Sequence, residues 1–85
     1  MLTQYIRAAL HKAHYEYVVE DGCYFATVPG LNGLWADGKT LEATRDTLAE
    51  VIEDWVIAHL IDRVPVPEVD GVAVGPREES IGVPV

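Results

Sequence analysis

The residues that could carry catalysis are carboxylates near the ends of expected strands. Carboxylate oxygens are the ligands that Mg²⁺ prefers, and metal-assisted hydrolysis needs several of them to converge. The candidates by position are Glu16, Glu20, Asp21 and Asp37. Glu20 and Asp21 fall in an expected hairpin turn and Asp37 precedes a glycine in another, where acidic residues are common. We therefore predict no catalytic residues, no metal, no cofactor and no enzymatic activity.

The histidines and the cysteine are the next candidates for chemistry. His11 and His14 are three positions apart but straddle an expected helix-to-strand junction, and His59 falls on the sheet-facing side of a long helix or at an interface. This spacing is not that of a metal site, and structural roles are favoured. Cys23 is a nucleophile only if a base stands beside it, and nothing nearby in the sequence supplies an electropositive setting. We expect it to be a small strand residue.

The first half of the chain predicts a short helix followed by antiparallel strands. Apolar residues recur every three or four positions over about 3–13, which is the helical period. Residues 14–20 alternate, and with the Asp21-Gly22 turn and the β-rich run 23–28 they predict a hairpin. Pro29 and the following glycines end that run, and residues 34–36 form a short third strand that runs to a turn at Asp37-Gly38.

The second half predicts one long helix and an extended end. Thr40 is the expected N-cap of a helix from about Leu41 to Ile61. Pro65 and Pro67 then favour an extended path, and Val72–Val74 could add one short strand to the sheet. The expected fold is α+β: a single domain over residues 1–74, with a three- to four-stranded antiparallel sheet, one long helix packed on it and an extra short N-terminal helix. Residues 75–85 are expected to be a loose tail.

The end of the long helix is apolar on most of its circumference. A stripe containing Leu41, Leu48, Ile52, Trp55 and His59 should cover the sheet, but apolar side chains spread beyond it in the last turns. Because an all-round apolar helix end is normally buried, a second subunit or the N-terminal helix should cover it. The predicted oligomer interface consists of Val56, Ile57, Leu60 and Ile61.

A second predicted surface is one for a protein partner. Trp35 lies between two glycine turns, where it either packs against Trp55 and the long helix or anchors a partner. Tyr24 has the same two alternatives. An acidic helix face is ordinarily just solvated, but it would speed association with a basic partner. The predicted partner-binding residues are Tyr24, Trp35, Glu50, Glu53 and Asp54.

The composition excludes some function classes. Six basic residues against 14 acidic ones give a net charge of −8, which disfavours direct nucleic-acid binding because phosphate contacts need clustered Lys and Arg. No apolar run has the length of a signal peptide or a membrane span. A soluble, cytoplasmic protein is expected. With 85 residues and one cysteine, its thin core favours a homo-oligomer, a dimer or a tetramer.

Five stretches, in this order, resemble the N-terminal domain of the HicB-type antitoxins. They are Asp21-Gly22, Tyr24–Pro29, Leu31–Gly33, Gly38–Ala43 and Pro65–Glu68. The resemblance covers about residues 14–74, and it is the order and spacing of these common pieces that make it specific. It implies a β-β-β-α-β arrangement, a truncated RNase-H-like fold without nuclease activity.

The resemblance also implies a partner. HicB-type proteins typically neutralise HicA, a small basic mRNA-cleaving toxin that has a double-stranded-RNA-binding-like fold and a catalytic histidine. The expected function is thus that of an antitoxin-type interaction protein, and the alternative is an orphan homo-oligomeric domain that binds another protein or a ligand. The chain departs from the family pattern in its extra first helix and in lacking a C-terminal DNA-binding segment.

Overall fold

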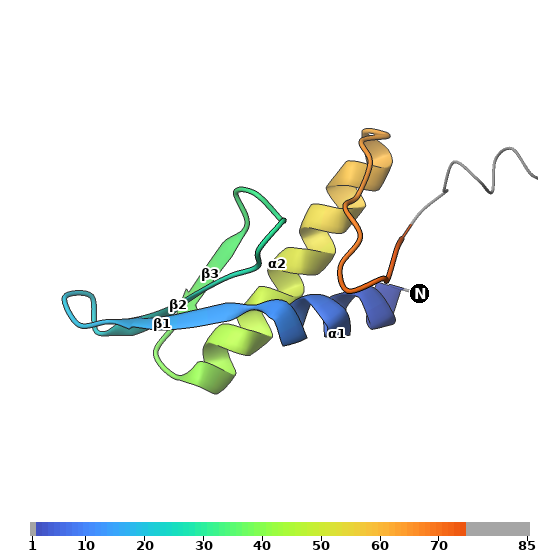
Figure 1. Cartoon of the computed structure of the whole chain (residues 1–85). Helices are drawn as coiled ribbons and strands as arrows, with labels where there is room; N and C mark the ends of the chain where they lie inside the picture. The colour runs from blue at the N-terminus through green and yellow to red at the C-terminus, as the bar shows by residue number, and fades with distance from the viewer. Residues whose placement is uncertain (1, 75–85) are drawn as a thin grey trace, which may run out of the picture.

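A three-stranded antiparallel sheet lies against one long helix (Figure 1). The computed structural model of the protein describes residues 2–74. The strands β1 (His14–Val18), β2 (Cys23–Thr27) and β3 (Trp35–Gly38) are ordered β1-β2-β3. Helix α2 (Leu41–Ile61) packs on β2 and β3, while α1 (Leu2–Lys12) leads into β1 and packs against α2. This arrangement confirms the predicted α+β class, and the tail predicted for residues 75–85 lies outside the described residues.

The β1-β2 hairpin closes through a loop at residues 19–22 rather than through a two-residue turn. The backbone N–H of Gly22 donates to the carbonyl of Val18 at 2.9 Å. Gly22 has φ +63°, a left-handed conformation that glycine adopts without strain. The loop sets the register in which Val18 faces Cys23 and Glu16 faces Phe25. The predicted hairpin is present, but β1 ends two residues before the predicted end at Glu20.

The junction between β3 and α2 depends on a cap and on a glycine. Thr40 caps the helix, its Oγ1 accepting from the backbone N–H of Ala43 at 3.0 Å. A Cβ at Gly38 would lie 2.7 Å from Oγ1 of Thr44 and 2.9 Å from its backbone nitrogen. The first turn of α2 therefore approaches the strand more closely than any other residue allows. The predicted turn at Asp37-Gly38 is wrong, since both residues belong to β3.

The core lies between the sheet and the two helices. On the sheet side it contains the small side chains Ala26 and Ala36, and the loop between β2 and β3 adds further apolar residues. The other buried apolar residues are Tyr5, Ala9, Val28, Leu31, Leu34, Leu48, Ile52, Val56 and Val69. The predicted helix stripe is correct at Leu48 and Ile52, but its first member, Leu41, is 47% exposed.

The segment after α2 packs on α1 and does not extend the sheet. The Tyr5 hydroxyl donates to the carbonyl of Pro67 at 2.6 Å, and Lys12 Nζ lies 3.8 Å from Asp70 Oδ1. Val69 and Val72 form an isolated bridge around the turn at Asp70 and Gly71. The fourth strand predicted at Val72–Val74 is thus wrong for the described part of the chain.

Neither helix within residues 2–74 combines the length and apolar content that a membrane crossing requires.

Candidate interaction surfaces

The two faces of the sheet differ in what covers them. Ala26 and Ala36 point toward α2 and are buried. Side chains alternate along a strand, so the neighbouring positions point the other way. We call this side the outer face, and within residues 2–74 neither helix lies over it (Figure 1). Its residues are His14, Glu16, Val18, Cys23, Phe25, Thr27, Trp35 and Asp37.

An aromatic pair occupies the middle of the outer face. The rings of Phe25 and Trp35 stack with centroids 5.8 Å apart and an interplanar angle of 25°. Trp35 is nevertheless 54% exposed. The alternative in which Trp35 packs against Trp55 is wrong, because the Trp55 ring lies on α2 against His59, with ring centroids 3.9 Å apart. A half-exposed tryptophan held by a stacked neighbour is typical of a protein-binding surface.

Two carboxylates flank this aromatic pair. Glu16 of β1 and Asp37 of β3 both stand directly opposite Phe25, and such cross-strand partners have Cβ atoms about 5 Å apart. Both residues are exposed. The ion pair found within residues 2–74 joins Lys12 to Asp70, so it neutralises neither carboxylate. The outer face thus combines exposed aromatic surface with negative charge.

The five predicted partner-binding residues do not form one surface. Trp35 lies on the outer face, whereas Tyr24 lies on the opposite side of the sheet, where its ring meets that of Tyr17 edge-on at 4.9 Å. The three acidic residues, Glu50, Glu53 and Asp54, are exposed on the side of α2 that points away from the sheet. A partner that covers Trp35 would therefore not reach the acidic side of α2 without wrapping around the molecule.

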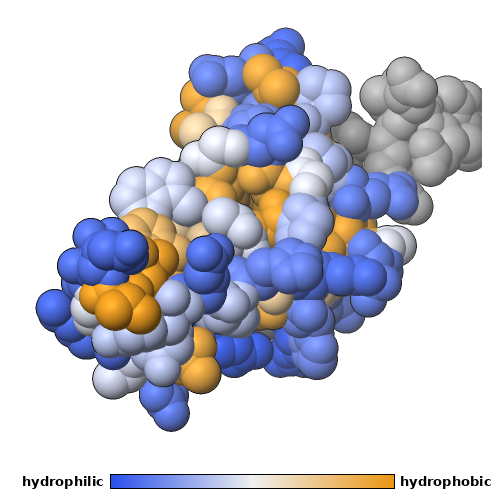
Figure 2. Space-filling view, turned by 60° about the vertical axis from the view of Figure 1, so that its left-hand side comes forward, coloured by the Kyte–Doolittle hydropathy of each residue, from blue (hydrophilic) through white to orange (hydrophobic). Residues whose placement is uncertain are grey.

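The end of α2 carries a separate apolar surface, the apolar helix end, formed by Ile57, Leu60, Ile61 and Val64. Their exposed fractions are 41%, 39%, 73% and 45%. Figure 2 shows hydrophobic atoms at the top of the view, over this end of the helix and the segment that follows. The prediction that Val56 belongs to the oligomer interface is wrong, because Val56 is fully buried in the core of the single chain. Sequence reasoning missed Val64, since it lies beyond the helix and outside the helical pattern.

The predicted catalytic candidates do not converge. Within residues 2–74 no three His, Cys, Asp or Glu side chains gather as a metal site would require. Glu20 and Asp21 lie in the hairpin loop, while Glu16 and Asp37 share the outer face but are separated by Phe25. Cys23 is half-buried on the same face.

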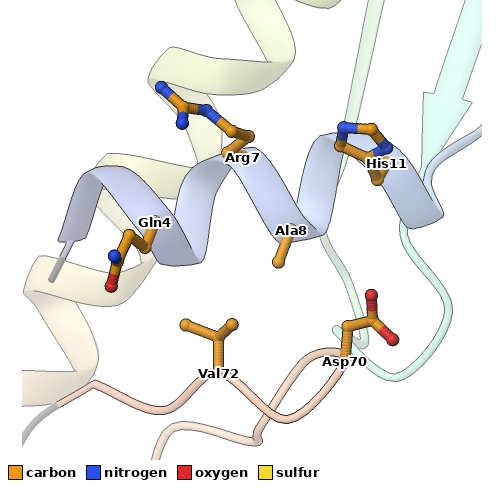
Figure 3. Close-up of a pocket in the computed structure, with 6 residues that line it drawn as sticks. All are labelled: Gln4, Arg7, Ala8, His11, Asp70 and Val72. Atoms are coloured by element: carbon orange, nitrogen blue, oxygen red, sulfur yellow. The ribbon is translucent and has the colours of Figure 1, made fainter.

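A shallow cleft of about 440 Å³ lies between α1 and the turn at residues 69–72. Its lining residues are Gln4, Arg7, Ala8, His11, Asp70 and Val72. In Figure 3 the Arg7 side chain points away from Val72, and only the small Ala8 projects toward the turn. Asp70 already pairs with Lys12. The polar groups do not converge on a common point, so the cleft lacks the geometry of a ligand site.

Comparison with known proteins places this fold in a family. The model of the UPF0150-like family matches residues 4–67. The chain belongs to the UPF0150-like family. Among solved structures, this UPF0150-like domain is similar to that of TTHA0281 from Thermus thermophilus. The two share 30% sequence identity and a TM-score of 0.81, and the match covers 91% of this chain and 95% of that one. No curated protein matches at a comparable level.

Proposed function

We propose that this UPF0150-like domain is a non-enzymatic, HicB-like antitoxin-type interaction protein. It would bind and neutralise a small basic mRNA-cleaving toxin of the HicA type in the cytoplasm, without contacting nucleic acid itself. The motifs that resemble HicB fall within or beside the region that the family model matches, residues 4–67. They also occupy the joints of the fold, including the hairpin loop and the β3-α2 junction.

The observation that carries this proposal is the exposed Trp35 on the outer face, flanked by carboxylates in a chain of net charge −8. Exposed tryptophan supplies affinity at protein interfaces, and negative potential speeds encounter with a basic protein. Inhibition would then be steric, with the domain lying over the RNA site of the toxin while its acidic residues meet toxin Lys and Arg.

The experiment is an affinity capture of the tagged protein from its own cells, followed by mass spectrometry and an RNA-cleavage assay. We expect a small, strongly basic protein at near-equal stoichiometry, whose RNA cleavage stops when this protein is added back. If a basic partner is captured but its activity is unaffected, or if only copies of this chain are recovered from cells that express the neighbouring genes, the antitoxin function is wrong.

We also propose that the protein is a homo-oligomer whose subunits meet at the apolar helix end. Four exposed apolar side chains on one short stretch are more than a small monomer normally leaves in water. Ile57→Asp should separate the subunits, whereas Thr47→Asp adds the same charge to an exposed site earlier on α2 and should not. A sedimenting species near 9.3 kDa at micromolar concentration for the unaltered protein would contradict this assembly.

The apolar helix end also favours the second candidate, an orphan homo-oligomeric domain that binds another protein or ligand. That function requires the oligomer but no toxin. It would be supported if the protein is oligomeric and no basic partner is captured.

A further inference from the structure

The outer face bears a combination of groups that recognises one kind of side chain. We propose that it is an arginine-docking surface, on which an arginine of a basic partner protein stacks against Trp35 and pairs with Asp37 and Glu16. The inference rests on the proposed function for the identity of the partner, but it names the site and the chemistry independently of what the partner does.

The aromatic part of the surface is held in place before any partner arrives. The stack on Phe25 orients the Trp35 ring at 25° to its neighbour and leaves 54% of the residue open to solvent. A side chain that is already fixed loses little conformational freedom on binding. Guanidinium groups stack on such rings, and the attraction operates within about 6 Å of the ring centroid.

The charged part of the surface lies within reach of the same guanidinium. Asp37 is two residues beyond Trp35 on β3 and on the same face, which is about 7 Å along a strand. Glu16 lies across Phe25 from Asp37. Neither takes part in the ion pair formed within residues 2–74, and the bases nearest in sequence, Lys12 and Lys39, lie outside the strands. Both carboxylates are therefore free to accept hydrogen bonds from a partner.

Arginine fits this surface better than the other occupants that an exposed aromatic could take. Its planar group combines stacking with two-pronged pairing to a carboxylate, whereas the lysine ammonium is a compact, strongly hydrated charge. A nucleic-acid base would also stack, but its phosphates would meet Glu16 and Asp37 rather than bases. A second copy of the chain, apposed through this face, would bring the same two carboxylates into a shared interface with no basic strand residue to balance them.

The chain contains an internal reference for testing this inference. Trp35 and Trp55 are its two tryptophans, and they lie on different elements in different surroundings. The two indole N–H groups give separate signals in a ¹⁵N-correlated NMR spectrum, and Trp35→Phe assigns them. The probe is a short peptide of alternating glycine and arginine, compared with peptides of equal length that carry lysine or the uncharged arginine analogue citrulline.

We expect the arginine peptide to shift the Trp35 signal in a saturable way and to leave the Trp55 signal in place. The lysine peptide should bind more weakly, and the citrulline peptide should have no effect at the same concentration. Trp35→Ala should weaken binding of the arginine peptide about three- to tenfold, the range of a partly exposed cation–π contact. Asp37→Asn and Glu16→Gln should each weaken it about two- to threefold at low salt.

Matched controls lie elsewhere on the molecule. Tyr17 is exposed to a similar extent, 51% against 54%, but points to the opposite side of the sheet. Tyr17→Ala should leave peptide binding unchanged, as should Glu50→Gln and Glu53→Gln on α2. Equal binding of the citrulline peptide, or shifts confined to the acidic side of α2 with Trp35 unmoved, would overturn the proposal. So would a Trp35 shift that depends on the concentration of this protein alone, which would indicate a second copy as the occupant.

This test and the test of the proposed function can fail separately. A captured basic toxin whose affinity is unchanged by Trp35→Ala would leave the antitoxin function standing and refute the arginine-docking surface. Saturable, arginine-selective binding at Trp35 in a protein that inhibits no toxin would do the reverse.

Discussion

The two faces of the sheet use side-chain size in opposite ways. The face toward α2 carries alanine at the centre of both β2 and β3, and both alanines are buried. The outer face carries phenylalanine and tryptophan, the larger side chains, and leaves the tryptophan half in water. Small residues let the helix approach closely, as Gly38 does at the strand end. The buried face of a sheet is thus not necessarily the one with the largest apolar side chains.

The comparison also separates stability from binding. Residues under α2 should matter for the free energy of unfolding, and residues on the outer face should matter for affinity. Each substitution below tests one side of that division.

The largest effect is expected at Ile52, which is fully buried in α2. Ile52→Ala should lower the free energy of unfolding by about 2–5 kcal/mol, since it removes buried methyl groups and leaves a cavity. Urea titration followed by circular dichroism measures the change. Ile57→Ala, on the exposed side of the same helix, is the control and should cost much less; equal losses would show that α2 packs differently.

Gly38→Ala should come next. The new Cβ would lie 2.7 Å from Thr44 Oγ1 and 2.9 Å from the Thr44 backbone nitrogen, so the strand end and the helix must move apart. Overpacking of this kind costs about 1–3 kcal/mol. Asp37→Ala, one residue earlier on the outer face, should leave the thermal midpoint nearly unchanged. The close approach is refuted if Gly38→Ala is as stable as the unaltered protein.

Tyr5→Phe tests the contact between α1 and the segment after α2. It removes the 2.6 Å hydrogen bond to Pro67 and should lower the free energy of unfolding by about 1 kcal/mol.

The same tyrosine should also make stability depend on alkaline pH. Burial raises the pKa of the Tyr5 phenol above its ordinary value. The unfolded chain therefore loses this proton first, and the stability present below about pH 10 declines as the pH rises toward the raised pKa. Tyr5→Phe should remove this part of the decline and Tyr17→Phe should not, as measured by urea titration across that pH range.

Tyr15→Phe should have a small effect of the opposite sign. The Tyr15 hydroxyl is buried without a hydrogen-bond partner among residues 2–74. Removing a buried, unpaired hydroxyl should leave stability unchanged or raise it by up to about 1 kcal/mol. A clear loss of stability on calorimetry would mean that the hydroxyl has a partner in solution.

The smallest effect on stability is expected at Trp35. Trp35→Ala should change the free energy of unfolding by about 0.5 kcal/mol or less, as for other exposed positions, although it should weaken binding of the arginine peptide severalfold. A large loss of stability would show that the outer face is part of the core, and the division between the two faces would then fail.

Most of the fold could be predicted because its joints are marked by local chemistry. Helix α2 begins at Leu41 as predicted, since the Thr40 cap acts within one turn of the chain. The position of β3 was predicted less well. An Asp-Gly pair ordinarily indicates a turn, and only the approach of Thr44 shows why Gly38 is a strand residue instead.

The candidate surfaces could be predicted only in part. Alternation along a strand divides residues between two faces but does not say which face a helix covers, so the environment of Trp35 had to come from the structure. The outward side of α2 was predicted at Ile57 and Ile61, yet Val56 lies inside because α1 packs against the same helix. The fourth strand failed for a similar reason: the segment after α2 finds its partners on α1, through contacts such as Tyr5–Pro67 that span most of the chain.

The sheet described here is open, with β1 and β3 as its two edges. Unpaired strand edges are templates for further strands from other molecules, and an exposed tryptophan on such an edge adds to the hazard of aggregation. Strand β3 is only four residues long and carries Asp37 beside Trp35, two features that discourage edge-to-edge pairing. The carboxylate assigned to arginine recognition thus has a second consequence: it lets a sticky side chain remain in water without recruiting copies of the same strand.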